Sequence, residues 1–235
     1  MTTKSVAEEL LELGFNLQAI FRFEQLPGAV RREITRHEPA SARFQNLILL
    51  ASGGSMFWPI MKQDAGVKME QPDPVDNYTI RALGNFFGND AIIVYPTNRL
   101  IPLQALGKLA GWHHDSPLGL GIHPVFGLWF AYRAVIMSHA DFTPLASELD
   151  VQTGPPCQSC RDKPCIPACP ASAAVKSGFK VQLCSDYRME PDSSCQSRCI
   201  SRLACPVGRD HRYLPEQMAY HYGHSLAAIR RNRGS

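Results

Sequence analysis

Eight cysteines carry the most specific chemistry in this sequence, and all of them lie between Cys157 and Cys205. None occurs in the first 156 residues, which indicates that the thiols serve one local structure. Their spacing separates two sets, C-x2-C-x4-C-x3-C-P and C-x10-C-x3-C-x5-C-P, each of which ends in a Cys-Pro pair. The first set is Cys157, Cys160, Cys165 and Cys169, and the second set is Cys184, Cys195, Cys199 and Cys205.

Four thiolates suit either a [4Fe–4S] cluster or a structural zinc ion. Bacterial two-cluster ferredoxins use C-x2-C-x2-C-x3-C-P, whose middle gap is two residues shorter than the corresponding gap here. Zinc modules favour paired C-x2-C knuckles, whereas this chain has a single C-x2-C and two Cys-Pro endings. The pattern therefore favours two [4Fe–4S] clusters over zinc, and disulfides are a distant third.

In two-cluster ferredoxins, the fourth cysteine of a motif binds the other cluster. If this crossing applies here, the ligands regroup across the two sets. One cluster would then be bound by Cys157, Cys160, Cys165 and Cys205. The other would be bound by Cys169, Cys184, Cys195 and Cys199. This pairing is a hypothesis of the sequence analysis.

The composition is that of an ordinary globular protein, with 235 residues, 45% apolar and 19% charged. A net charge of +3 is too small to indicate a nucleic-acid partner, and the basic ending at 230–233 is interpreted as a solvated tail. No run approaches 18 uninterrupted apolar residues, so no membrane association is expected. The N-terminus lacks the apolar core of a signal peptide, which predicts a cytoplasmic protein with reduced thiols. The oligomeric state cannot be inferred.

Alternating and helical periodicities predict a mixture of strands and helices before the cysteines. A capping box at Ser5 and Glu8 opens a helix that ends at Gly14, and Asp76 is expected to cap a second helix. The mixture predicts an α+β sandwich as the main domain. Strands are expected at 15–23, 44–50, 91–95 and 127–137, and further helices at 103–110 and 215–229.

A domain boundary is expected near residue 150, where Gly154-Pro155-Pro156 interrupts any regular element. The predicted domains are therefore 1–150 and 151–235. The second segment is too short and too poor in apolar residues to bury a core alone. We therefore expect bound clusters to replace the missing hydrophobic burial, as in other small metal-held folds.

Two residues near the predicted strand at 127–137 could contact a ligand. Arg133 lies among apolar neighbours, and a buried guanidinium must be paired with a carboxylate or lie beside an anionic ligand. His123 precedes the strand, in the kind of loop that carries sites, and is either a packing residue or a cofactor contact. The sequence leaves both alternatives open for both residues.

The run His123-Pro124-x-Phe126-Gly127-x-Trp129-Phe130-Ala131-x-Arg133 resembles a motif of the CblC family of cobalamin-processing proteins. The resemblance implies a nitroreductase-like α+β fold that binds cobalamin. It also implies that four residues contact the cofactor, which is cobalamin or FMN. These are His123, Phe126, Trp129 and Arg133.

The two cysteine sets resemble the ferredoxin-like part of epoxyqueuosine reductase, which couples two [4Fe–4S] clusters to a cobalamin. The whole chain is similar to bacterial ferredoxin-like iron–sulfur proteins, with which it shares the "CPVG…RY…PEQ" pattern from Cys205 to Gln217. These resemblances imply a CblC-like domain followed by a ferredoxin-like two-cluster module. No residue here matches the acidic catalytic residue of epoxyqueuosine reductase, so the catalytic residues are unknown.

The function expected from the sequence is iron–sulfur redox chemistry. An electron donor protein would reduce the clusters, and a corrinoid or flavin on the N-terminal domain would receive the electrons. Two other classes stay open. One is a simple electron carrier without a second cofactor, and the other is a cobalamin-handling protein with structural cysteines.

Overall fold

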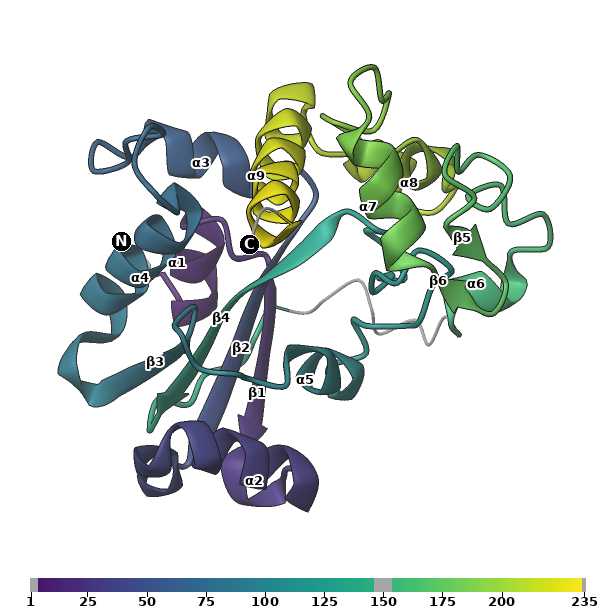
Figure 1. The fold of residues 1–235 in the computed structure, drawn as a ribbon. Helices are drawn as coiled ribbons and strands as arrows, with labels where there is room; N and C mark the ends of the chain where they lie inside the picture. Colours follow the sequence, from purple (N-terminus) through teal and green to yellow (C-terminus); the bar gives the residue numbers. More distant parts are fainter. Residues whose placement is uncertain (1–3, 146–153, 234–235) are drawn as a thin grey trace. The chain divides into compact units, whose positions relative to one another are not determined.

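The computed structural model describes residues 4–145 and 154–233. The chain divides into two compact units, each built from two segments (Figure 1). The first unit is Met1–Gly111 with Phe130–Asp150, and the second is Trp112–Trp129 with Val151–Ser235. The predicted boundary near residue 150 lies outside the described residues. Segment 112–129, which that prediction assigned to the N-terminal domain, groups instead with the cysteines.

A four-stranded antiparallel sheet forms the centre of the first unit, with strand order β1-β2-β4-β3. The strand β2 is buried along its whole length because β1 and β4 pair with it on both sides. All four strands lie where the periodicity predicts strands, within a few residues at each end. They are β1 Leu17–Arg22, β2 Asn46–Gly53, β3 Ala91–Tyr95 and β4 Phe130–Ser138.

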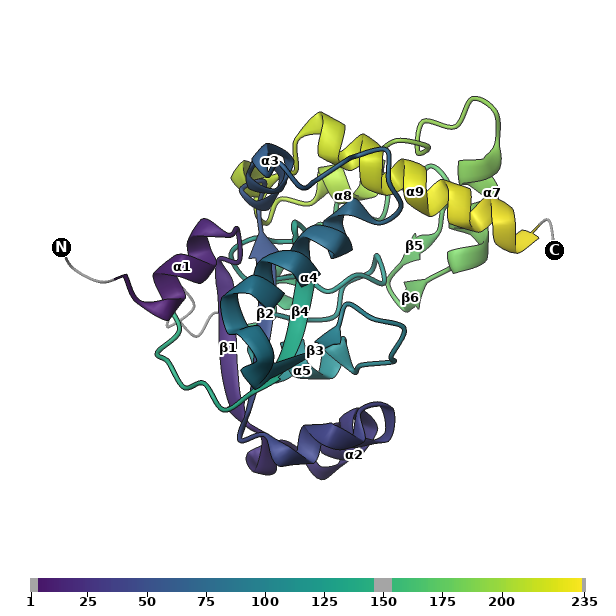
Figure 2. The same ribbon diagram turned by 90° about the vertical axis from the view of Figure 1, so that its left-hand side faces the viewer.

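Helices cover both faces of this sheet. Helix α4 packs on β3 and β4, and α5 lies on the opposite face (Figures 1 and 2). The predicted α+β class is thus confirmed as a helix-covered sheet. The α-helices of the unit are α1 Val6–Glu12, α2 Gly28–His37, α3 Phe57–Gln63, α4 Pro74–Phe87 and α5 Leu103–Leu109. Short 3-10 turns are η1 Phe23–Gln25, η2 Pro39–Arg43 and η3 Gly88–Asp90.

Of the two predicted helix caps, one was right and the other was wrong. The capping box of α1 is present, with the Glu8 amide donating to Ser5 Oγ and the Ser5 amide donating to the Glu8 carboxylate. Helix α4 begins at Pro74, two residues before the expected cap at Asp76. Proline fits the first turn because its missing N–H would have no helical partner there. Asp76 therefore lies inside the first turn of α4 and does not cap the helix, although the sequence pattern is compatible with both positions.

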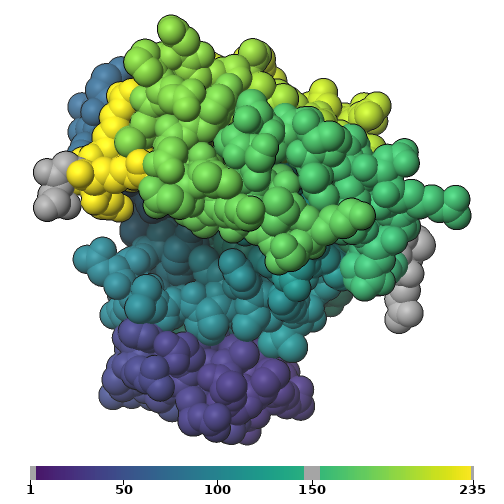
Figure 3. Space-filling model, turned by 45° about the vertical axis from the view of Figure 1, so that its right-hand side comes forward, coloured from purple at the N-terminus to yellow at the C-terminus, as the bar shows by residue number. Residues whose placement is uncertain are grey.

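The second unit contains short elements joined by loops. Its two-stranded sheet pairs β5 with β6, and α7 packs against α9, which extends to Arg233 rather than ending at the predicted 229. In Figure 3 the green cysteine-rich residues form a continuous surface. The elements are α6 Pro156–Ser159, β5 Ala174–Val175, β6 Gly178–Phe179, α7 Val181–Met189, α8 Ile200–Ala204, η5 Arg209–His211 and α9 Pro215–Arg233. Within the two described stretches, no helix is both long and apolar enough to cross a membrane.

The second unit has a small apolar core, which corrects one expectation. Leu118, Ile122 and Leu128 pack with Ala174 and with cysteines from both sets. The expectation that residues 151–235 must replace their missing burial with bound clusters alone was therefore incomplete. Segment 112–129 supplies apolar side chains that the cysteine segment lacks, and buried thiols complete the same cluster of contacts.

Candidate metal centres

Four cysteines form a first group in the second unit. Burial raises the pKa of the Cys157 thiol to about 11, and the neighbouring Cys205, Cys165 and Cys160 raise it further. Burial also raises the pKa of Cys165, with Cys205 and Cys160 contributing. Like charges shift each other's pKa only when they are near. We call this group, Cys157, Cys160, Cys165 and Cys205, the first site.

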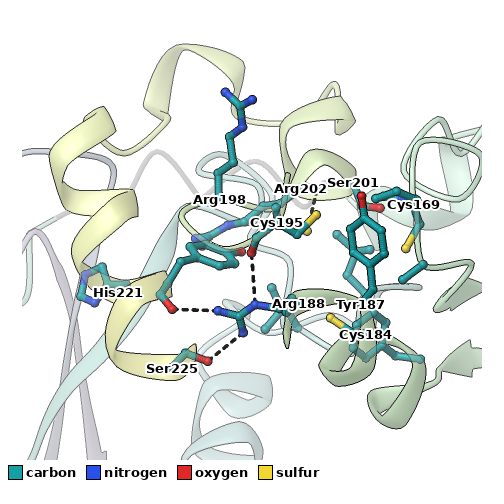
Figure 4. A pocket seen from close by; sticks show the side chains of 17 residues that line it. Cys169, Cys184, Tyr187, Arg188, Cys195, Arg198, Ser201, Arg202, His221 and Ser225 are labelled. Atoms are coloured by element: carbon teal, nitrogen blue, oxygen red, sulfur yellow. Dashed lines mark hydrogen bonds between the residues drawn. The ribbon is translucent and has the colours of Figure 1, made fainter. Parts of the chain in front are cut away.

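The other four cysteines form a second group. Burial raises the pKa of Cys184, and Cys199, Cys169 and Cys195 contribute in the same direction. All four line one cavity of about 290 Å³ (Figure 4). This volume lies near the lower end of the range for small-ligand pockets. We call this group, Cys169, Cys184, Cys195 and Cys199, the second site.

The grouping is the crossed one, because each site takes three cysteines from one sequence set and one from the other. Cys205 lies with the first set and Cys169 with the second. All eight thiols are free of disulfides. Among residues 4–145 and 154–233, no three His, Cys, Asp or Glu side chains gather closely enough to hold a single metal ion.

Helix α8 connects the two sites directly. Its N-cap is Cys199 of the second site, whose Sγ accepts a hydrogen bond from the Arg202 amide at 3.4 Å. Its C-cap is Cys205 of the first site, and the following Pro206 cannot continue a helix. One five-residue helix therefore carries a thiol of each site at its two ends.

Backbone amides favour the ionised form of one thiol. Burial by itself raises the pKa of Cys169, but the amides of Ala174, Ala173 and Ala171 and the Ser201 hydroxyl outweigh it, so the pKa is lowered. The Ala173 amide donates to Cys169 Sγ at 3.3 Å. Because the thiolate is the form that binds metals, this loop prepares Cys169 to act as a ligand.

Two buried arginines adjoin the second site. Arg188 is four residues after Cys184 on α7, and it donates to the carbonyl oxygens of Cys195 at 3.2 Å and Tyr222 at 2.7 Å (Figure 4). Arg202 donates to the Leu128 carbonyl oxygen at 2.5 Å, and its guanidinium lies 4.2 Å from the Trp129 ring centroid. Each hydrogen bond satisfies a donor, but none supplies a negative charge.

The residues at both sites fit iron–sulfur clusters. Each site offers four thiols, which is the ligand number of a [4Fe–4S] cluster. At the second site, two buried cations require an anion, and four thiolates around a metal cluster would provide one. This fit rests on the ligand set and on the charge of the surroundings.

The predicted loop residues His123 and Phe126 pack inside the second unit. The fully buried His123 ring accepts the Val125 and Phe126 amides on Nδ1, both at 3.1 Å. Burial lowers the pKa of His123 to about 3, helped by the charges of His114 and His211, so the imidazole is neutral near pH 7.

Two glycines let this loop approach the chain that follows Cys205. A Cβ on Gly127 would lie 2.1 Å from the Val207 carbonyl oxygen, and one on Gly208 would lie 2.4 Å from the Phe126 backbone. Both glycines have positive φ, of +58° and +69°. The two resemblance patterns, "HPVFG" and "CPVG", therefore pack together backbone against backbone.

Arg133 belongs to the first unit, whereas the other three predicted cofactor residues belong to the second. It occupies a bulge of β4, where the pairing with β2 shifts between Leu50 and Ala51. Bulges redirect side chains. The buried Arg133 donates to Ser52 Oγ at 2.8 Å, and its guanidinium lies 4.4 Å from the Phe57 ring centroid. His123, Phe126 and Trp129 lie in the second unit, and the cofactor role of all four stays a prediction.

Sequence reasoning did not identify Arg188, Arg202, Gly127 or Gly208 as important. The arginines had a usable signal, because a residue four after Cys184 on a helix shares its face, and Arg202 lies three residues after Cys199. The two glycines stand in the resemblance patterns "HPVFG" and "CPVG", but no local pattern indicated that segments 80 residues apart approach each other there.

No protein-family model matches this sequence, and no curated protein matches it. The fold is similar to solved structures of epoxyqueuosine reductase. One of them, in complex with an epoxyqueuosine-modified tRNA stem loop, has a TM-score of 0.51 and 14% identity, over 91% of this chain and 68% of that one. The enzyme from Streptococcus thermophilus has a TM-score of 0.48 and 15% identity, over 86% of this chain and 65% of that one.

These likenesses concern the fold. This chain spans about two thirds of the length of the structures that it resembles. The tRNA stem loop is a ligand of that neighbour.

Proposed function

We propose that this chain is an iron–sulfur redox protein whose second unit holds two [4Fe–4S] clusters. The first site would use Cys157, Cys160, Cys165 and Cys205, and the second Cys169, Cys184, Cys195 and Cys199. The observation that carries the proposal is the sorting of eight free thiols into two groups of four. When bound, such clusters supply one-electron transfer.

The residues of the second unit have three tasks in this proposal. The cysteines bind as thiolates, which the amides around Cys169 favour. The apolar core of Leu118, Ile122 and Leu128 limits access of water to the first site, with which it packs. The capped helix α8 holds Cys199 and Cys205 at a fixed separation.

We further propose that the first unit receives electrons on a corrinoid or flavin, after an electron donor protein has reduced the clusters. The support for this part is the resemblance of residues 123–133 to the CblC motif, together with the buried cation Arg133 at a strand bulge. Burial raises the pKa of the Asp76 carboxyl, and the charge of Arg133 opposes this larger effect. We propose that the Arg133 guanidinium also contacts an anionic group of the cofactor, such as a phosphate. The activity is then that of a reductase.

Anaerobic purification tests the first part of the proposal. We expect about eight iron atoms and a similar amount of acid-labile sulfide per chain, since each cluster holds four of each. A folded protein with stoichiometric zinc and no iron would refute the proposal and favour structural cysteines.

Titration of the iron-loaded protein with cobalamin and with FMN tests the second part. Saturable binding that Arg133→Met weakens supports the reductase. Clusters without binding of either cofactor would leave a simple electron carrier.

An RNA substrate is tested separately, because the neighbour with bound RNA concerns another protein. A labelled tRNA stem loop is mixed with the iron-loaded chain at several salt concentrations. Binding that persists at physiological salt and depends on the loop sequence would establish RNA as a partner. Binding that disappears with modest salt would reflect the basic surface alone.

A further inference from the structure

Arg188 and Arg202 are both inside the second unit, with exposed fractions of 6% and 8%. Arg188 Nε donates to the carbonyl oxygen of Cys195 at 3.2 Å, and the backbone amide of Arg202 donates to Cys199 Sγ at 3.4 Å. Each arginine therefore lies close to a different cysteine of the second site. Both side chains line the same cavity as the four cysteines (Figure 4).

The contacts of these arginines are neutral. Arg188 donates to two carbonyl oxygens and, at 3.0 Å, to the Ser225 hydroxyl. Arg202 donates to one carbonyl oxygen, and its guanidinium carbon lies 4.2 Å from the ring centroid of Trp129 and 4.9 Å from that of Tyr213. Within the described part of the chain, neither arginine has a carboxylate partner. Two buried charges without an anion would be costly unless the site itself is anionic.

The first site has a different electrostatic environment. Lys163 lies two residues before Cys165, and Arg209 and Arg212 lie four and seven residues after Cys205. Arg209 is exposed, and Lys163 and Arg212 are half-buried. Water and salt screen such charges far more than they screen buried ones. The two sites therefore have the same cysteine ligands, but the cations at the second site are more buried and less screened than those at the first.

We propose that Arg188 and Arg202 are the counter-ions of the second site and give its cluster a higher reduction potential than that of the first. This inference rests on the proposed function, because it presupposes iron–sulfur clusters at both sites. One-electron reduction adds one negative charge to a site, and that electron comes from the external donor, which is oxidised. Buried cations stabilise the added charge, so the electron resides preferentially at the second site.

The inference assigns a direction to electron flow within the unit. At equilibrium with a donor of intermediate potential, the second site is reduced and the first is oxidised. Arg188 and Arg202 do not bind the cluster as ligands and act only through their charge. Their removal should therefore shift a potential without changing the cysteine ligands.

The test is a redox titration of the anaerobically purified full chain, with dithionite as reductant and electron paramagnetic resonance as readout. Cys184→Ala and Cys205→Ala assign the two signals, since each removes a ligand from one site. The variants are Arg188→Gln and Arg202→Gln, which remove the charge, and Arg188→Lys and Arg202→Lys, which keep it. The matched control is Arg198→Gln, because Arg198 borders the same cavity but is exposed and extends away from the cysteines (Figure 4).

We expect the second-site potential to be the higher one in the natural sequence, to fall in both glutamine variants, and to stay near its original value in the lysine and Arg198 variants. Selective loss of the second-site cluster in the glutamine variants, with retention in the lysine variants, supports the same role. Equal potentials in the glutamine, lysine and Arg198 variants would overturn the inference, as would a higher potential at the first site. Absence of iron from the unsubstituted chain would refute the proposed function instead.

Discussion

In the first unit, β2 is buried at all eight of its positions, and the other strands of the sheet are five to nine residues long. In the second unit the paired strands are two residues long, and three of the six buried residues in the cluster around Leu118 are drawn from segment 112–129. The first unit buries continuous apolar strands, whereas the second brings distant loops and thiols together. The first unit should therefore be sensitive to cavities in its strands, and the second to the loss of single thiols and close backbone contacts, which the following substitutions test.

The largest effect is expected from Cys205→Ala. Because Cys205 lies with Cys157, Cys160 and Cys165, its loss should remove the first-site cluster and about half of the iron. Iron and sulfide analysis with electron paramagnetic resonance measures this. Loss of the second-site signal alone would show that the crossed grouping is wrong.

Gly127→Ala should destabilise the second unit by about 3 kcal/mol, because the added Cβ overpacks a rigid contact and φ is positive. The obstructing atom is the backbone carbonyl oxygen of Val207, at 2.1 Å, which cannot turn aside as a side chain could. The measurement is the loss of visible absorption with increasing urea. Gly223→Ala on α9 is the control, since nothing lies within 4 Å of its Cβ. That change should be neutral or stabilising by up to about 1 kcal/mol, and similar curves for the two variants would contradict the packing argument.

Leu49→Ala should lower the free energy of unfolding of the first unit by about 3 kcal/mol, since it leaves a cavity in the fully buried β2. The iron content under native conditions should not change. Circular dichroism during urea unfolding measures the first effect. Leu100→Ala is the matched control because that side chain is 72% exposed, and its effect should stay within about 0.5 kcal/mol. Loss of iron from the Leu49 variant would mean that cluster binding in the second unit depends on the stability of the first unit.

His123→Asn tests a smaller contribution, which depends on pH. The folded pKa of about 3 lies below the ordinary value of 6.5, so the unfolded chain takes up a proton first as the pH falls. His123 should therefore cost the natural chain about 2 kcal/mol of stability between pH 7 and pH 5. Asparagine keeps an acceptor for the two loop amides but does not titrate. The free energy of unfolding should fall less steeply in the variant, and parallel curves would contradict the low pKa.

The sequence predicted the first unit well because its elements are encoded locally. The strand at 91–95 was predicted with its observed bounds, and the capping box of Ser5 and Glu8 was found as expected. Such patterns depend on residues a few positions apart. The start of α4 was wrong because Asp76 inside a first turn and Asp76 at a cap give nearly the same pattern.

The second unit was less accessible to sequence reasoning. The cysteine sets were evident, and analogy suggested the crossed grouping. The attachment of segment 112–129 was not evident, because Leu118, Ile122 and Leu128 have the spacing of an ordinary loop. The contact between Gly127 and Val207 joins residues 80 positions apart, and such contacts depend on tertiary structure.

Helix α8 has a consequence for how fast charge could travel through this protein. The span from Cys199 to Cys205 is about 9 Å at the rise of an α-helix. A helical spacer cannot lengthen without breaking its own hydrogen bonds. The distance over which an electron tunnels between the two redox centres would therefore stay constant. Electron exchange between them would then need no hinge, lid or domain movement, and its rate would be insensitive to solvent viscosity.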